Sequence, residues 1–168
     1  MATEKGYDLI DNGSGMLPKM ARFALSWGGG THFDDPQFIG KFGFGLPNAS
    51  INQTRRVEVY TRRRTDEAIT KAWLDINNVQ AHGLTRIEEP ETADLPEFVQ
   101  RYLKDNGLTF DHGTVVVWVT PDRLSYRKGS TLKEHLLDDF GVTYRYMLND
   151  VELNVAGKKV EPVDPFFQ

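Results

Sequence analysis

The spacing of three glycines in the stretch IGKFGFGLPNAS, residues 39–50, restricts the fold of this chain more than any other feature. Gly40, Gly43 and Gly45 carry no side chain, and a small, apolar, helix-like run follows them. A loop of this kind lets main-chain N–H groups and the start of a helix approach an anion. The spacing fits neither of the two best-known phosphate loops, G-x-G-x-x-G and G-x-x-x-x-G-K-[ST]. The alternative is a helix–loop junction in which glycine only permits close packing.

A second glycine pattern, Asp11-x-Gly13-x-Gly15, follows a short apolar run at residues 7–10 that we predict to be a strand. A carboxylate only accepts hydrogen bonds, so Asp11 at a strand end suits an exocyclic amine such as that of adenine. The two glycines let the backbone approach a flat ring. The alternative is a plain turn, because Asp, Asn, Gly and Ser are the usual turn residues.

The order of the motifs resembles one superfamily, the GHKL ATPases, named for gyrase, the ninety-kilodalton heat-shock chaperone, histidine kinases and MutL. DNGSGM is similar to the D-x-G-x-G motif of that family, and IGKFGFGLPNAS is similar to the lid motif of its chaperone branch. HGTVVVWV resembles its distal G-T segment, and VELNVAGKKVEPVDPF resembles the closing hairpin of microrchidia-like members. The resemblance covers most of the chain.

The resemblance implies an ATP/ADP site with a role for each matching residue. Asp11 would bind the adenine amine with support from Thr114, while Gly13 and Gly15 would lie against the base and Met16 would form an apolar wall. The residues that would wrap the phosphates with main-chain N–H groups are Gly40, Lys41, Phe42, Gly43, Phe44 and Gly45. Residues 28–39 would form a lid that orders over bound nucleotide.

Two departures from the family pattern qualify this expectation. Family members carry, on a helix before the D-x-G-x-G strand, a glutamate that activates water and an asparagine that binds Mg²⁺, but only ten residues precede Asp11 here. We therefore expect a truncated domain that binds nucleotide without hydrolysing it, with Mg²⁺ held by phosphates and water. Leu46-Pro47 also stands where microrchidia-like relatives have Phe-Lys. The rival hypothesis is a non-catalytic interaction module that keeps the fold without nucleotide.

The remaining patterns predict one layered α/β domain over residues 1–168. The resemblance implies that this domain is a two-layer sandwich of the GHKL type, with a mixed, largely antiparallel sheet and helices on one face. Expected strands cover residues 7–10, 57–61, 68–76, 84–87, 112–119, 151–155 and 158–160. Expected helices begin at Pro18, cover 46–52 and 95–103, and run from a capping box at Thr131 and Glu134 to Gly141. We expect this chain alone to be monomeric, with dimerisation confined to the full-length parent.

Composition narrows the choice of partners and compartment. A net charge of −4 argues against a protein whose whole surface binds nucleic acid. Arginines at 55–56 and 62–64, with Tyr60 between them, leave a weaker hypothesis of nucleic-acid binding open. The alternative is that these arginines belong to a solvated strand end and turn. The chain has no cysteine, and its four histidines lack ligand spacing, so no metal site is expected. No apolar run approaches the roughly 20 residues of a membrane span, and we expect a cytoplasmic protein.

Overall fold

A computed structural model describes residues 6–28, 43–83, 86–126 and 128–166 of the chain. These residues form two compact units, residues 1–123 and 124–168, which we describe separately. The expected single domain over residues 1–168 stays a prediction. No helix within the described ranges is long and apolar enough to cross a membrane.

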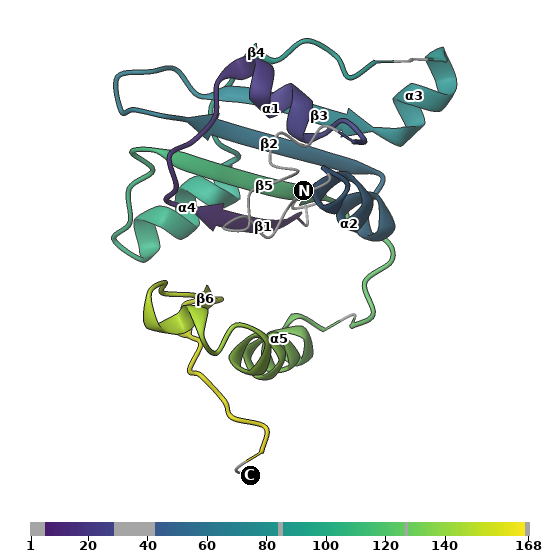
Figure 1. The fold of residues 1–168 in the computed structure, drawn as a ribbon. Coiled ribbons are helices and arrows are strands. Elements are labelled where there is room, and N and C mark those ends of the chain that lie inside the picture. The colour runs from purple at the N-terminus through teal and green to yellow at the C-terminus, as the bar shows by residue number, and fades with distance from the viewer. Residues whose placement is uncertain (1–5, 29–42, 84–85, 127, 167–168) are drawn as a thin grey trace. The chain divides into compact units, whose positions relative to one another are not determined.

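The first unit is built on a five-stranded sheet with the strand order β1-β5-β2-β3-β4 (Figure 1). The strands are β1 (Gly6–Asp11), β2 (Arg56–Arg62), β3 (Thr70–Asp75), β4 (Glu91–Thr92) and β5 (Gly113–Val119). The α/β class is therefore confirmed. Each described strand pair is antiparallel, so the mixed pairing expected from the sequence is not found.

Strands β2 and β5, which lie side by side inside the sheet, carry buried side chains on both of their faces. On β2, Val57 and Val59 face one apolar cluster, whereas Tyr60 faces another on the opposite side of the sheet. On β5, Val115 and Val117 join the cluster of Tyr60, while Val116 and Trp118 pack against the first. A strand that is apolar at consecutive positions needs cover on both sides, because burying apolar surface stabilises by about 25 cal/mol per Å².

Three helices pack against the cluster of Val57 and Val59: α1 (Pro18–Ala24), α2 (Gly45–Gln53) and α3 (Ile76–His82). Helix α1 begins at Pro18, whose fixed φ suits a first helical position. Helix α3 was not expected from the sequence. Asp75 starts it by accepting hydrogen bonds from the amides of residues 77 and 78, and Gly83 ends it in the left-handed conformation.

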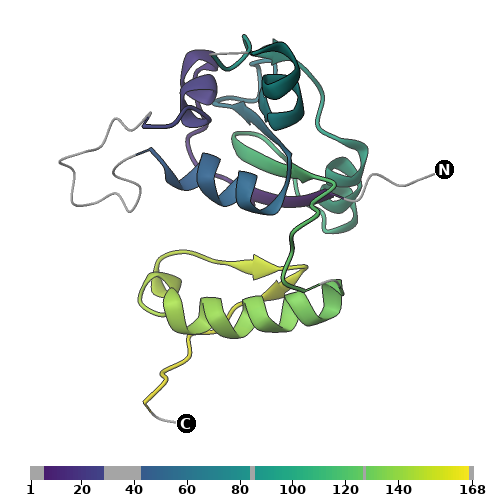
Figure 2. The ribbon, with the colours of Figure 1, turned by 90° about the vertical axis from the view of Figure 1, so that its right-hand side faces the viewer.

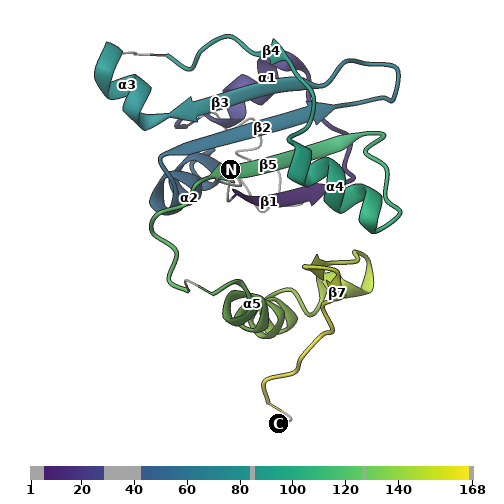
Figure 3. The same ribbon diagram turned by 180° about the vertical axis from the view of Figure 1, so that it is seen from behind.

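Helix α4 (Glu97–Asp105) covers the opposite face of the sheet, as Figures 2 and 3 show. Val99 and Leu103, one helical turn apart, are buried in the cluster of Tyr60. The prediction of helices on one face is therefore wrong in this detail. The strand expected at 84–87 is not found at residues 86 and 87, which form no strand. Residues 84–85 lie outside the described residues.

The second unit contains α5 (Gly129–Thr143), a short 3-10 helix η1 (Met147–Asn149) and a hairpin of β6 (Asn154–Val155) and β7 (Lys158–Lys159). Helix α5 begins two residues before the predicted capping box and continues through Gly141. A Cβ at Gly141 would lie 2.7 Å from the carbonyl oxygen of Glu161, so this glycine permits close packing and does not end the helix. The predicted hairpin is confirmed, with positive φ at Ala156 and Gly157 in its turn.

Candidate functional site

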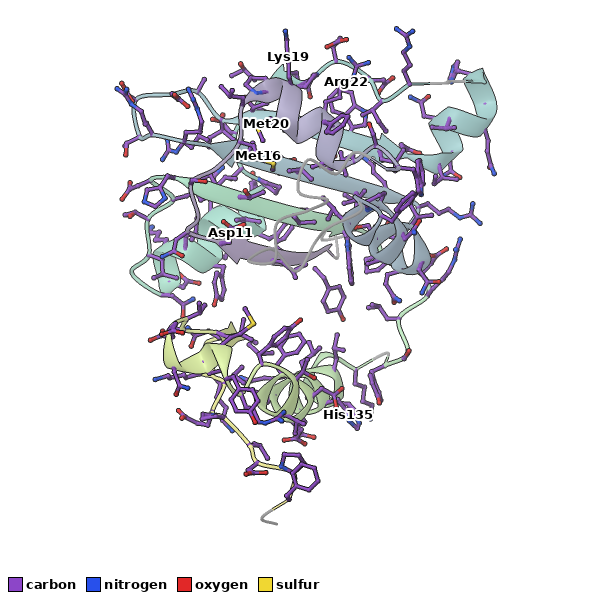
Figure 4. All side chains as sticks on the ribbon, in the orientation of Figure 1. Asp11, Met16, Lys19, Met20, Arg22 and His135 are labelled. Atoms are coloured by element: carbon purple, nitrogen blue, oxygen red, sulfur yellow. The ribbon has the colours of Figure 1, made fainter. Side chains whose placement is uncertain are left out.

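Asp11 is the last residue of β1, and it lies directly opposite Thr114 of β5 in the register of the sheet. Because opposed residues of a strand pair point to the same face, both side chains face the side covered by α1 and α2. The Asp11 Oδ1 atom accepts a hydrogen bond of 2.8 Å from the amide of Gly13. The carboxylate thereby closes its own turn, and Figure 4 shows it at the end of β1.

The turn packs against other backbone so closely that a side chain at either of two glycines would clash. Gly15 has φ +65°, and a Cβ there would lie 2.1 Å from the carbonyl oxygen of Arg62. Gly113 has φ +120°, and a Cβ there would lie 2.0 Å from the carbonyl oxygen of Asp11. The sequence interpretation gave Gly15 the task of approaching a ring. The structure adds a separate reason, which is contact with β2.

A buried threonine that the sequence interpretation missed lies between these segments. The hydroxyl of Thr61 accepts a hydrogen bond from the amide of Met16 at 2.9 Å and donates one to the carbonyl of Gly113 at 2.8 Å. Its oxygen also lies 3.4 Å from the hydroxyl oxygen of Thr114. In the sequence, Thr61 was only one of several alternating residues in a strand. A hydroxyl at a core position was the available signal, since buried polar groups need partners.

The glycine-rich segment is described only in part. Gly40, Lys41 and Phe42 lie outside the described residues, as does most of the expected lid. Of the rest, Gly43 has φ +67°, and Gly45 is the first residue of α2.

Phe44 is the N-cap residue of α2, where no side chain caps the helix and the first turn holds no acid. The helix therefore presents uncapped N–H groups at its start.

The two flanks of the glycine-rich segment lie side by side. A Cβ at Gly28 would lie 3.5 Å from the ring of Phe44. The indole nitrogen of Trp27 donates a hydrogen bond of 2.8 Å to the Asn48 side chain on α2. The residues on either side of the intervening segment, Gly28 and Phe44, are therefore neighbours in space.

The D-x-G-x-G turn and α2 share one apolar core. Met16, after the turn, and Leu46, in the first turn of α2, both pack against the cluster of Val57 and Val59. The indole nitrogen of Trp118 on β5 donates to the Ser50 hydroxyl on α2 at 3.0 Å. The turn and the start of α2 thus lie on the same face of the sheet, beside the side chains that β5 presents to that face.

The family model described as "Histidine kinase-, DNA gyrase B-, and HSP90-like ATPase" matches residues 2–114. The chain belongs to this family. A comparison with curated proteins gave no match. The matched region of this GHKL-type ATPase domain contains both glycine motifs and ends at Thr114. The matched residues accordingly belong to a domain of the ATP-binding type.

The arginine clusters of this ATPase domain are engaged within the protein. Arg55 and Arg56, at the start of β2, form ion pairs with Asp122 and with Glu58 and Asp75. At the other end of the strand, Arg62 donates to the carbonyl of Phe110, Arg63 pairs with Glu67, and Arg64 pairs with Asp66. The two clusters lie at opposite ends of a seven-residue strand, so they form no continuous basic patch.

Two carboxyl groups with shifted pKa values lie on the opposite face of the sheet from Asp11, each beside Val117 in the register. Burial raises the pKa of Asp8, against a smaller effect of its own backbone amide. Burial would also raise the pKa of Glu58, but hydrogen bonds from the Tyr60 hydroxyl and the Arg56 guanidinium, with the charge of Lys71, hold it below its usual value. Neither group belongs to the candidate site.

Proposed function

We propose that residues within the first unit bind an adenine nucleotide, ATP or ADP, at the turn between β1 and α1. The observation that carries this proposal is the Asp11 carboxylate, held at a strand end opposite Thr114 and on the same face as the start of α2. One face then offers a group for the base and a group for the phosphates. The family membership supports the same ligand.

Asp11 and Met16 are the groups proposed for the base. Oδ1 of Asp11 already accepts from the Gly13 amide. A carboxylate has about four lone-pair sites, so it keeps capacity to accept from the exocyclic amine of adenine. Thr114, opposite Asp11, supports this contact, Gly13 and Gly15 bring the turn backbone to the base, and the half-buried Met16 gives the site an apolar wall.

The phosphates are proposed to lie against the start of α2. The helix dipole and the uncapped N–H groups favour an anion there, because helix N-termini carry partial positive charge. Gly43, Phe44 and Gly45 form this end of the helix, and Gly40, Lys41 and Phe42 extend it in the proposal. Residues 28–39 would close over the nucleotide as a lid.

The proposal concerns binding and assigns no hydrolytic residue to this chain. The described residues hold no group of three or more His, Asp or Glu side chains suited to a metal ion. In this proposal Mg²⁺ accompanies ATP on the phosphates and water, because Mg²⁺ usually keeps several of its waters. A relationship to the chaperone or microrchidia-like branches, and dimerisation of a full-length parent, belong to the same proposal.

The test is calorimetry and thermal unfolding with ADP and ATP, each with and without Mg²⁺. A ligand at 100 times its Kd adds about 2.7 kcal/mol to stability, which raises Tm by a few degrees at this size. Asp11→Asn should weaken binding about tenfold or more, whereas Asp105→Asn, at the exposed end of α4, should leave it unchanged. Equal affinity of the parent and Asp11→Asn would reject the base contact.

A second candidate function is a protein-interaction module that has the fold without nucleotide. The observation that favours it is that Gly15 and Gly113 are required by backbone packing alone. These two glycines would therefore be needed even in a chain that had lost the ligand. This candidate predicts a flat calorimetric titration with every nucleotide.

A further inference from the structure

Thr61 occupies the middle of the contact between the two motif segments. Its side chain is fully buried, and it projects from β2 toward the face that carries Asp11 and Thr114. A hydroxyl has one hydrogen to donate and two lone pairs. Here the hydrogen goes to the Gly113 carbonyl, one lone pair takes the Met16 amide, and the Thr114 hydroxyl lies within reach of the other. The Thr61 hydroxyl therefore uses its hydrogen and one lone pair to join the two segments.

The surrounding backbone explains why a side chain is needed there. Gly15 lies against the Arg62 carbonyl and Gly113 lies against the Asp11 carbonyl. The turn therefore contacts the end of β2 and the start of β5 through backbone atoms alone at these two positions. A ring nitrogen of His112 lies 2.8 Å from the Gly13 carbonyl, but this contact is exposed. The Thr61 hydroxyl is, by contrast, a buried side-chain group, and it links the residue after the turn to the G-T segment.

We propose that Thr61 is a positioning residue of the nucleotide site. It fixes Met16 and Gly113 relative to each other, and through them it sets the separation of the Asp11 carboxylate and the Thr114 hydroxyl across the strand pair. This inference rests on the proposed function, since the consequence is for the base that the two residues hold. Thr61 itself acts through its neighbours and does not touch the nucleotide.

The experiment compares Thr61→Val and Thr61→Ser with Thr54→Val as the matched control. Valine keeps the size of the side chain and removes the hydroxyl, whereas serine keeps the hydroxyl. Thr54, equally buried, precedes β2 and donates to the Val119 carbonyl at 2.6 Å, at the other end of β2 from Thr61 and the G-T segment. Thr61→Val and Thr54→Val should therefore lose comparable stability for different local reasons.

Calorimetry with ADP, well below every Tm, separates positioning from stability. Thr61→Val should weaken ADP binding about tenfold, Thr61→Ser should restore it to within about threefold, and Thr54→Val should leave it unchanged. A Thr61→Val protein with the parent's Kd and only a lower Tm would overturn the proposal. So would a Thr61→Ser protein as weak as Thr61→Val, because the methyl group and not the hydroxyl would then matter.

Hydrogen exchange of the Met16 amide, measured without nucleotide, keeps this test separate from that of the proposed function. Thr61→Val should accelerate this exchange at least tenfold relative to Thr54→Val, since the amide loses its acceptor. If the parent binds no nucleotide, the proposed function fails, and accelerated exchange still supports the link made by Thr61. Unchanged exchange at Met16 would overturn that link whatever the nucleotide result.

Discussion

Gly15 and Gly107 have almost the same backbone conformation, with φ +65° and +64°, but different surroundings. A Cβ at Gly15 would meet the Arg62 carbonyl at 2.1 Å, whereas nothing lies within 4 Å of one at Gly107. The left-handed conformation alone costs an L-residue roughly 1–2 kcal/mol. A comparison of the two glycines therefore isolates the effect of the contact with β2.

We expect Gly107→Ala to lower the free energy of unfolding by about 1 kcal/mol and Gly15→Ala by at least about 3 kcal/mol, since the second change adds a clash with backbone to the same conformational strain. Urea denaturation of the two variants measures the difference. Equal losses would show that the turn can move away from β2, and the close packing of Gly15 would not be essential.

Glu58 gives the protein a defined response to acid. Its pKa is held below the ordinary value of 4.5, so the unfolded chain binds the proton more tightly than the folded chain. The stability contributed by this carboxylate is therefore present above about pH 4.5 and is lost as the pH falls through the lower folded value. Glu58→Gln should cost about 1–3 kcal/mol at pH 7 and show a shallower loss below pH 4.5.

Asp8 serves as a control of opposite sign for this pH dependence. Burial raises its pKa above the ordinary 3.8, so its ionised form destabilises the folded chain at neutral pH. Asp8→Asn should therefore stabilise at pH 7, with a benefit that declines once the pH falls below the folded pKa of Asp8 and is gone below about 3.8. Urea unfolding at several pH values measures both variants, and parallel curves for Glu58→Gln and the parent would contradict the prediction for Glu58.

At the scale of single residues, the sequence indicated which residues belong to the candidate site better than it indicated which contacts hold them in place. The turn after Asp11 was predicted from its residues, and the association of Asp11 with Thr114 was implied by the resemblance; the structure places the two residues opposite each other. The roles of Thr61 and of the Arg62 carbonyl were not predicted, because they depend on which backbone lies beside the turn in space. A single sequence carries no direct signal of such non-local contacts.

Among the helices and strands, α4 is the element that distinguishes the structure from the predicted arrangement. It packs on the face of the sheet opposite α1 and α2, with Leu103 in the core (Figure 3). The continuous apolar run of β5 already implied two buried faces. Which helix would cover the second face was not readable from the periodicity of residues 95–103, because an amphipathic helix packs equally well on either side.

Leu103→Ala tests this placement of α4. We expect a loss of about 2–4 kcal/mol in the free energy of unfolding, because the change removes a buried leucine from a closed cluster. Arg101→Ala, at an exposed position of the same helix, should change stability by less than about 0.5 kcal/mol. Thermal or urea unfolding decides, and a negligible effect of Leu103→Ala would mean that α4 does not cover the sheet.

Helices α3 and α5 show why some helices, and the residues at which helices end, were hard to predict from the sequence. Helix α3 was missed because its asparagines and β-branched residues favour other structures, and the Asp75 cap that starts it lies within the preceding strand. Helix α5 was found, but Gly141 was taken for its end. A glycine inside a helix can equally reflect close contact, and only the packing against Glu161 shows which applies.

At the scale of the whole molecule, the family match and the compact unit end at different residues. The match covers residues 2–114, whereas the first unit extends to residue 123. The difference contains residues 115–119 of β5, which pairs with both β1 and β2 and holds Val115 and Val117 in the core. After β5, the amide of Asp122 donates to the Gln53 carbonyl and fixes the end of the unit to α2.

We therefore predict that residues 1–123 fold without the second unit, whereas residues 1–114 do not, because the shorter chain lacks the core strand. The 1–123 protein should unfold in one cooperative urea transition and keep the parent's Kd for ADP within about threefold, since each proposed site residue lies before residue 123. Denaturant titration and calorimetry on both truncations measure this. An unfolded 1–123 protein beside a folded full chain would instead favour the single domain over residues 1–168, with the second unit required to stabilise the sheet.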